Sequence, residues 1–222
     1  MQVILKLLLV IPVASMLGGC ISNPHIVDGN DRVIGGGAAL GGVASAQDLN
    51  KGLRAAQNGD FEIAFEIIKP LAEQGDARAK FNLGVMYNRG EGVTQDYAEA
   101  VKWYRKAAEQ GNAKAQNNLG AMYDNGYGVT QDYAEAAKWF RKAAEQGIAD
   151  AQNNLGVMYG IGNGVLQDTI AAHMWFNIAA ANGNTHAAKA RDIVAGKLSS
   201  SDILKAQQKA KRCRASGYKD CD

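Results

Sequence analysis

Apolar and polar positions between residues 76 and 183 repeat with a period of 36 residues. A leucine, a tyrosine and a tryptophan each recur at a fixed phase of this period. Self-similarity of this length is the signature of a stacked repeat, in which each unit exposes an apolar face that the next unit covers. The recurring residues are Leu83, Leu119 and Leu155, then Tyr87, Tyr123 and Tyr159, then Trp103, Trp139 and Trp175.

Each unit contains two segments with the spacing of an amphipathic helix. The first segment of the first unit places Ala79, Leu83 and Met86 on one stripe of a helix. The second segment places Ala100 and Trp103 in the same relation. The tyrosine and tryptophan series fall at the packing phase, so we expect them in the core. The pattern therefore predicts a helix pair in every unit.

Polar residues and glycines mark the expected ends of these helices. Asp76 and Asn112 stand where an N-cap would accept hydrogen bonds from the first turn. The third unit has Ile148 there, so a ragged start near Asp150 is expected. Two glycines in a Gly-x-Gly-Val segment make a tight reversal. An Asp three residues before a Glu, as at 96–99, then resembles a capping box.

The complete pattern resembles the Sel1-like repeat, a relative of the tetratricopeptide repeat with a longer loop between its helices. That pattern reads A-x-x-x-L-G-x-x-Y-x-x-G-x-G-V-x-x-D-x-x-x-A-x-x-W-x-x-x-A-A-x-x-G. The resemblance implies an all-α fold, a right-handed α-solenoid, and a role in protein interaction. The first unit matches at Ala79, Leu83, Gly84, Tyr87, Gly90, Gly92, Val93, Asp96, Ala100, Trp103, Ala107, Ala108 and Gly111.

One polar position recurs on the expected first helices, directly before each core leucine. It is occupied by Asn82, Asn118 and Asn154, and Arg78 and Lys114 lie four residues earlier on the same face. An amide both donates and accepts, so a ladder of amides can pair with the main chain of an extended peptide. In tetratricopeptide domains, which the chain resembles, the matching Asn contacts bound peptide. The alternative is that these amides bond to neighbouring helices or to water.

Two atypical segments flank the repeats at 76–183. Residues 47–75 form a shorter helix pair without the glycine loop, and residues 184–222 are expected to be capping helices. Cys213 and Cys221, eight residues apart, could close a small loop by a disulfide in an oxidising compartment. Two unpaired thiols are the alternative.

The N-terminus carries two competing export signals. Residues 1–19 have the form of a signal peptide, and the apolar run within them, Leu7 to Leu17, is too short to span a bilayer. The segment ends at a motif that resembles a bacterial lipobox. Cys20 would then be lipidated, and residues 20–46 would be a Gly-rich tether. A second apolar run ends in an A-x-A site at Ala46. The first signal predicts a membrane-anchored lipoprotein facing the periplasm, and the second a soluble periplasmic or secreted protein.

Composition and motifs argue against several classes of function. The net charge is only +2 and no basic stripe is visible, so no nucleic-acid partner is expected. The three histidines show no metal-binding spacing, and we expect His173 on a helix surface and no metal or cofactor. Ser216 begins an S-x-x-K segment without the motifs that accompany it in penicillin-binding enzymes.

Together these features predict a monomeric, non-catalytic scaffold that binds a protein or peptide in the bacterial cell envelope. Its only contact with the membrane would be the lipid on Cys20. The alternative is an envelope enzyme that acts on cell-wall peptide or a β-lactam.

Overall fold

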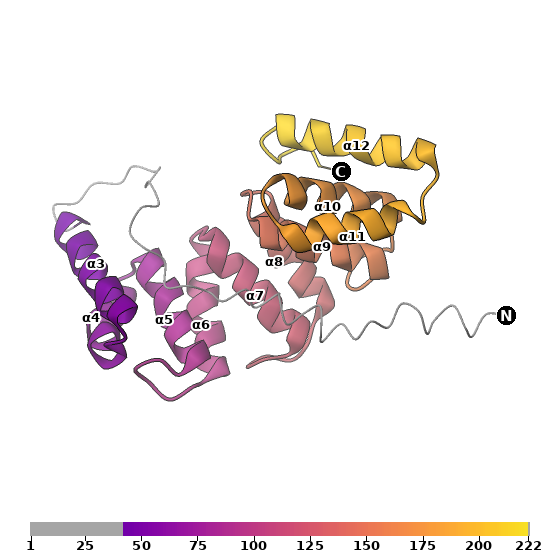
Figure 1. Cartoon of the computed structure of the whole chain (residues 1–222). Helices are drawn as coiled ribbons and strands as arrows, with labels where there is room; N and C mark the ends of the chain where they lie inside the picture. Colours follow the sequence, from indigo (N-terminus) through magenta and orange to yellow (C-terminus); the bar gives the residue numbers. More distant parts are fainter. Residues whose placement is uncertain (1–41, 222) are drawn as a thin grey trace.

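The computed structural model describes residues 42–221, with side chains from residue 46 onward. This part of the chain forms ten helices and no strand (Figure 1), which confirms the predicted all-α solenoid. The helices are α3 (Gly42–Asn58), α4 (Phe61–Glu73), α5 (Ala77–Arg89), α6 (Tyr97–Glu109), α7 (Ala113–Asn125), α8 (Tyr133–Ala144), α9 (Ala149–Ile161), α10 (Thr169–Ala181), α11 (Thr185–Ala195) and α12 (Ser200–Ala215).

The helices pack in chain order into an elongated stack with α3 and α4 at one end and α12 at the other (Figure 1). Within the repeats α5 packs on α6, α7 on α8 and α9 on α10, and each pair also packs on the next. Buried side chains form a series of clusters along the stack. The apolar face of each helix pair is thus buried by its neighbours, as the repeat period requires.

Small residues let the two helices of each pair approach closely. A Cβ atom on Gly84 would lie 2.7 Å from the ring of Tyr104. The same position in the next two units, Gly120 and Gly156, faces the rings of Phe140 and Phe176 at 2.8 Å. Only hydrogen fits there, so the helix spacing inside each unit depends on these glycines.

The second glycine of each inter-helix loop has a role that the sequence pattern does not reveal. Gly164 has a φ of +67°, and a Cβ atom there would lie 2.1 Å from the backbone oxygen of Tyr133 in the preceding unit. Gly92 and Gly128 make the same approach to the units before them. These loops therefore reverse the chain within one unit and also pack against the backbone of the preceding unit.

The capping residues act largely as expected. The Asp76 side chain accepts hydrogen bonds from the first turn of α5, and Asn112 does the same for α7. Ile148 makes no side-chain cap, yet α9 begins directly after it at Ala149. At the N-terminal end α3 begins at Gly42, before the expected start at residue 47, so the A-x-A segment at 44–46 lies inside a helix.

The C-terminal segment closes the stack by covering α10. Trp175 is buried because α12 packs over its helix, whereas Trp103 and Trp139 are half-buried. The core placement expected for the tryptophans therefore holds fully only for Trp175. A disulfide joins Cys213 to Cys221, the pairing that the sequence analysis sets against two unpaired thiols. Within residues 42–221, no helix combines the length and apolarity needed to cross a membrane.

Candidate functional site

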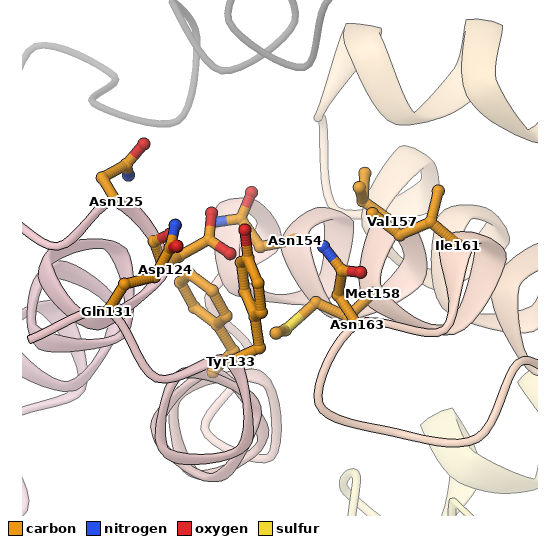
Figure 2. Close-up of a pocket in the computed structure, with 10 residues that line it drawn as sticks. Asp124, Asn125, Gln131, Tyr133, Asn154, Val157, Met158, Ile161 and Asn163 are labelled. Atoms are coloured by element: carbon orange, nitrogen blue, oxygen red, sulfur yellow. The ribbon is translucent and has the colours of Figure 1, made fainter. Parts of the chain in front are cut away.

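A pocket with a volume of about 190 Å³ lies where α7, α8 and α9 meet (Figure 2). The end of α7 and the start of α8 supply one wall, and α9 with the loop after it supplies the other. Figure 2 shows Asp124, Tyr133 and Asn154 pointing toward one another at its centre. The described lining residues are Asp124, Asn125, Gln131, Tyr133, Phe140, Asn154, Val157, Met158, Ile161 and Asn163.

Asp124 is the acidic group of this pocket, and its surroundings disfavour its charge. It is the next-to-last residue of α7, where the free carbonyl groups of a helix end oppose a negative charge. Burial raises the pKa of its carboxyl to about 6, because the ionised form loses hydration. None of the described lining residues is basic. A carboxylate placed at a cost in a pocket is a candidate for ligand binding.

The loop that follows α7 is fixed against the helix end beside Asp124. The Gln131 side chain donates a hydrogen bond of 2.6 Å from Nε2 to the backbone oxygen of Asp124. Gln95 and Gln167 hold the corresponding loops in the same way, at 2.8 Å each. This repeated bond keeps the mouth of the pocket in a defined geometry.

The structure places the three predicted ladder amides in different surroundings. Asn154 borders the pocket but is only 4% exposed, and its Nδ2 donates to Asn117 Oδ1 at 3.4 Å. Asn82 is buried and donates to the backbone oxygen of Arg78 at 2.8 Å. Asn118 is half-buried. Bonds within the protein thus occupy the amide donors of Asn82 and Asn154, and peptide contact by the ladder stays a prediction.

Asn118 lies at the phase of Asn154, next to the buried hydroxyl of Tyr104. Burial raises the pKa of Tyr104, and the nearby Asn118 opposes this only partly. Neither the Tyr104 hydroxyl nor Asn118 Nδ2 has a partner in hydrogen-bonding geometry among the described residues. The ring of Tyr104 corresponds to that of Phe140, which lines the pocket.

Arg78 and Lys114 lie away from this pocket, in the first turns of α5 and α7. Both side chains are half-buried. Lys114 precedes Asp124 by ten residues on the same helix, which corresponds to roughly 15 Å along the axis. The predicted basic residues and the pocket are therefore at opposite ends of the first helices.

A second polar series, which sequence reasoning missed, ties the units together. Gln116 Nε2 donates to the backbone oxygen of Ala108, and Gln152 Nε2 donates to that of Ala144, both at 3.0 Å. The Gln146 side chain in turn donates to Gln116 at 2.7 Å. The sequence does show this series, because Gln116 and Gln152 lie 36 residues apart, at the same position of successive units. Because the glutamine side chains donate to backbone oxygens in the turns between units, we assign them a structural role.

Ser216 and His173, the residues considered for the enzyme alternative, are engaged in contacts within the protein. Ser216 Oγ donates to the backbone oxygen of Cys213 at 2.8 Å and accepts from the backbone N–H groups of Lys219 and Asp220. His173 is 2% exposed, so its expected surface position is wrong; α11 packs on its helix, α10. Burial, and then Arg191, lower the pKa of His173.

Two further sequence predictions concern metal and lipid. In the part of the chain from residue 42 to 221, no three His, Cys, Asp or Glu side chains group closely enough to hold a metal ion. Cys20, the predicted lipidation site, lies outside the described residues, as do the segments proposed as signal peptide and most of the tether.

Comparison with known proteins agrees with the repeat that the geometry shows. The model of the Sel1 repeat family matches residues 77–112, 113–148 and 149–184. Residues 77–184 are therefore three Sel1 repeats. No curated protein matches it. The three matched segments coincide with the helix pairs α5–α6, α7–α8 and α9–α10, so the pocket lies between the second and third Sel1 repeats.

Two solved structures are similar to the Sel1 stack. One is a protective antigen present in uropathogenic Escherichia coli strains that displays an SLR fold. Its sequence identity to this chain is 44% and the TM-score is 0.63. The match covers 64% of this chain and 32% of that chain. The other is a Sel1 repeat protein from Oxalobacter formigenes, 39% identical, with a TM-score of 0.60, over 64% of this chain and 60% of that one. The match thus spans about a third of the first protein and three fifths of the second.

The corresponding place between the first and second Sel1 repeats contains larger side chains. Tyr127 stacks on Tyr97 there, with ring centroids 5.2 Å apart and an interplanar angle of 19°. Asn163 occupies the position of Tyr127 at the next boundary, where Tyr133 replaces Tyr97. An amide cannot stack as a phenol ring does, so the replacement leaves room beside Tyr133.

Proposed function

We propose that this Sel1-like repeat protein is a non-catalytic scaffold that holds an extended segment of a partner protein in the bacterial cell envelope. Sel1 repeat proteins are generally scaffolds for protein interaction. The observation that carries the proposal is the pocket at the second repeat boundary, with the polar Asn154 and the acidic Asp124 in its walls. Convergent polar groups in a preformed hollow are typical of a binding site.

The stack contributes rigidity to this function. The helix pairs are packed on both sides, and the loops are pinned by Gln131 and its equivalents. A partner that binds to such a surface does not have to order it, which lowers the cost of association. The chemistry required is recognition alone, and the hydrogen bonds of Ser216 within its own loop support a structural role for the S-x-x-K segment.

The proposed location in the envelope rests on the sequence of the N-terminal segment and on the cysteines. The lipobox-like motif before Cys20 supports export and a lipid anchor. The disulfide between Cys213 and Cys221 supports an oxidising compartment, because such bonds rarely persist in the cytosol. We propose that the scaffold acts as a monomer attached to the membrane by its lipid.

Site-specific crosslinking in living cells tests the binding surface. A photo-reactive amino acid at Ile161, an exposed residue at the pocket rim, should capture a partner protein. The matched control places the same amino acid at Lys102, which is exposed on α6, the second helix of the first repeat. This position should capture no partner protein. Equal capture at both positions, or capture at Lys102 alone, would place the interaction elsewhere.

Labelling with palmitate tests the anchor separately. The wild-type chain should incorporate the label, and the variant Cys20→Ser should not. If both remain unlabelled while the chain is exported, the cleavage site at Ala46 becomes the better explanation.

A further inference from the structure

The pocket between α7, α8 and α9 has a charge that its own walls do not balance. The carboxylate of Asp124 lies at the C-terminal end of α7, where the helix dipole adds further negative potential. Among residues 42–221 none forms an ion pair with it, and Tyr133 is the only other titratable side chain lining the pocket. Burial favours the neutral acid, as its raised pKa reflects. A cation in the pocket would relieve this cost.

The walls of the pocket combine an apolar surface with a polar one, and a long basic side chain needs both. Val157, Met158 and Ile161 form an apolar side on α9, whereas Asp124 and Asn154 form a polar centre (Figure 2). Lysine and arginine bury their methylene stems against apolar surface and place the charged group among acceptors. An anion would meet the Asp124 carboxylate, and a wholly apolar group would leave the polar centre unsatisfied.

The pocket has room for a group much larger than a water molecule. Its volume of about 190 Å³ far exceeds the roughly 10–15 Å³ that one water molecule requires. The side-chain amides of Gln131 and Asn163 at its edge add acceptors for the N–H groups of a cation.

We propose that this pocket binds one lysine or arginine side chain of the partner segment, with the Asp124 carboxylate as its counter-ion and the α9 side chains as the wall for its stem. This inference rests on the proposed scaffold function, because it assigns the chemistry of the segment that the scaffold holds. It also assigns the contact to the second repeat boundary, since Asn88 and Tyr127 stand where the pocket has Asp124 and Asn163.

The direct test is a peptide titration of the full chain followed by NMR. The probe is an acetylated, amidated pentapeptide, Gly-Ala-Lys-Ala-Gly, compared with the same peptide containing arginine, citrulline or norleucine at the centre. The lysine and arginine peptides should shift the amide signals of α7, the start of α8 and α9. The uncharged norleucine and citrulline peptides should bind at least tenfold more weakly.

Three variants separate the contact from general effects of charge. Asp124→Asn keeps the shape and removes the charge, and should weaken binding of the lysine peptide at least tenfold. Asn163→Tyr keeps the charge and fills the space, as Tyr127 does at the first boundary, and should weaken binding to a similar degree. Asp192→Asn removes an equal charge from an exposed side chain on α11 and should leave binding unchanged.

Several results would overturn the proposal. The proposal is wrong if the lysine and norleucine peptides bind equally, or if Asp124→Asn leaves the affinity for the lysine peptide unchanged. It is also wrong if the peptides shift only amide signals outside α7–α9, or if no peptide binds at millimolar concentration. If crosslinking at Ile161 still captures a partner in Asp124→Asn cells, the scaffold function survives and only the basic side chain is excluded. If Ile161 captures no partner even in the chain that keeps Asp124, the scaffold function is wrong too.

Discussion

The boundary between the first and second Sel1 repeats and that between the second and third share their main contacts but differ in what they leave open. Arg105 donates to the hydroxyl of Tyr123 at the first, and Arg141 donates to Tyr159 at the second. The glutamine bonds to the turns repeat likewise, at 3.0 Å in each case. The helices are therefore held together by the same interactions at both boundaries.

The differences lie at one edge, around the ends of α5 and α7. The first boundary has Asn88 and the stacked Tyr127, and the second has Asp124 and Asn163 in their places. A few side chains thus convert a packed boundary into an acidic pocket while the backbone geometry is kept. The comparison teaches that the packing positions of such a stack can stay fixed while neighbouring positions change its chemistry.

The largest expected effect comes from breaking the second boundary at its loop. Gly164→Ala should lower the free energy of unfolding by about 2–5 kcal/mol, because the new methyl group would meet the Tyr133 backbone oxygen at 2.1 Å in a left-handed conformation. Gly183→Ala, with a φ of +93° and open space around it, is the control and should cost only about 1–2 kcal/mol. Urea unfolding gives both values. Equal losses would mean that the loop does not support the boundary.

Removing the shared arginine contact should affect the two boundaries alike. Tyr123→Phe and Tyr159→Phe each lose a hydrogen bond to a charged group on a half-buried ring, at a cost of about 1.5 kcal/mol. The measurement is the unfolding midpoint in urea for each variant. A clearly unequal pair would contradict the view that both boundaries are held together in the same way.

The charge at Asp124 should make stability depend on pH. Its folded pKa of about 6 lies above the ordinary 3.8, so the folded state binds the proton more tightly. The wild type should therefore lose stability as pH rises from about 4 to about 6.5, whereas Asp124→Asn should not. Above this range the variant should be more stable by about 1 kcal/mol, a value reduced for partial exposure to solvent.

Unfolding curves at several pH values, compared with those of Asp192→Asn, provide the check. A wild type and an Asp124→Asn variant with parallel pH profiles would show that this carboxylate is not destabilised in the folded protein.

The smallest effect concerns the aromatic stack at the first boundary. Tyr127→Asn should cost about 0.5 kcal/mol, since Tyr97 and Tyr127 are 38% and 41% exposed and stacking on the surface is weak. A double-mutant cycle with Tyr97→Ala isolates the ring contact from other losses. A coupling free energy near zero would mean that the stack merely occupies the space and does not stabilise the boundary.

Much of the fold could be predicted because its determinants are local. Asp76, Asn112 and the first glycine of each loop, such as Gly90, act on backbone groups within a few residues of themselves, and the period of 36 residues identifies which faces must be covered. The predicted helix pairs accordingly agree closely with α5 to α10. The candidate site was predicted less well: Asn154 borders the pocket, but the chemistry of Asp124 was not foreseen.

The helical unit, its caps and its repetition follow from local features of the sequence. The tertiary structure decided which polar groups are buried and where a hollow remains. Asn82 became buried, His173 was covered, and Gly164 became a contact with the preceding unit because helices from different repeats meet there. The physical reason is distance along the chain: a cap or a turn depends on neighbours in sequence, whereas burial depends on side chains that only packing brings together.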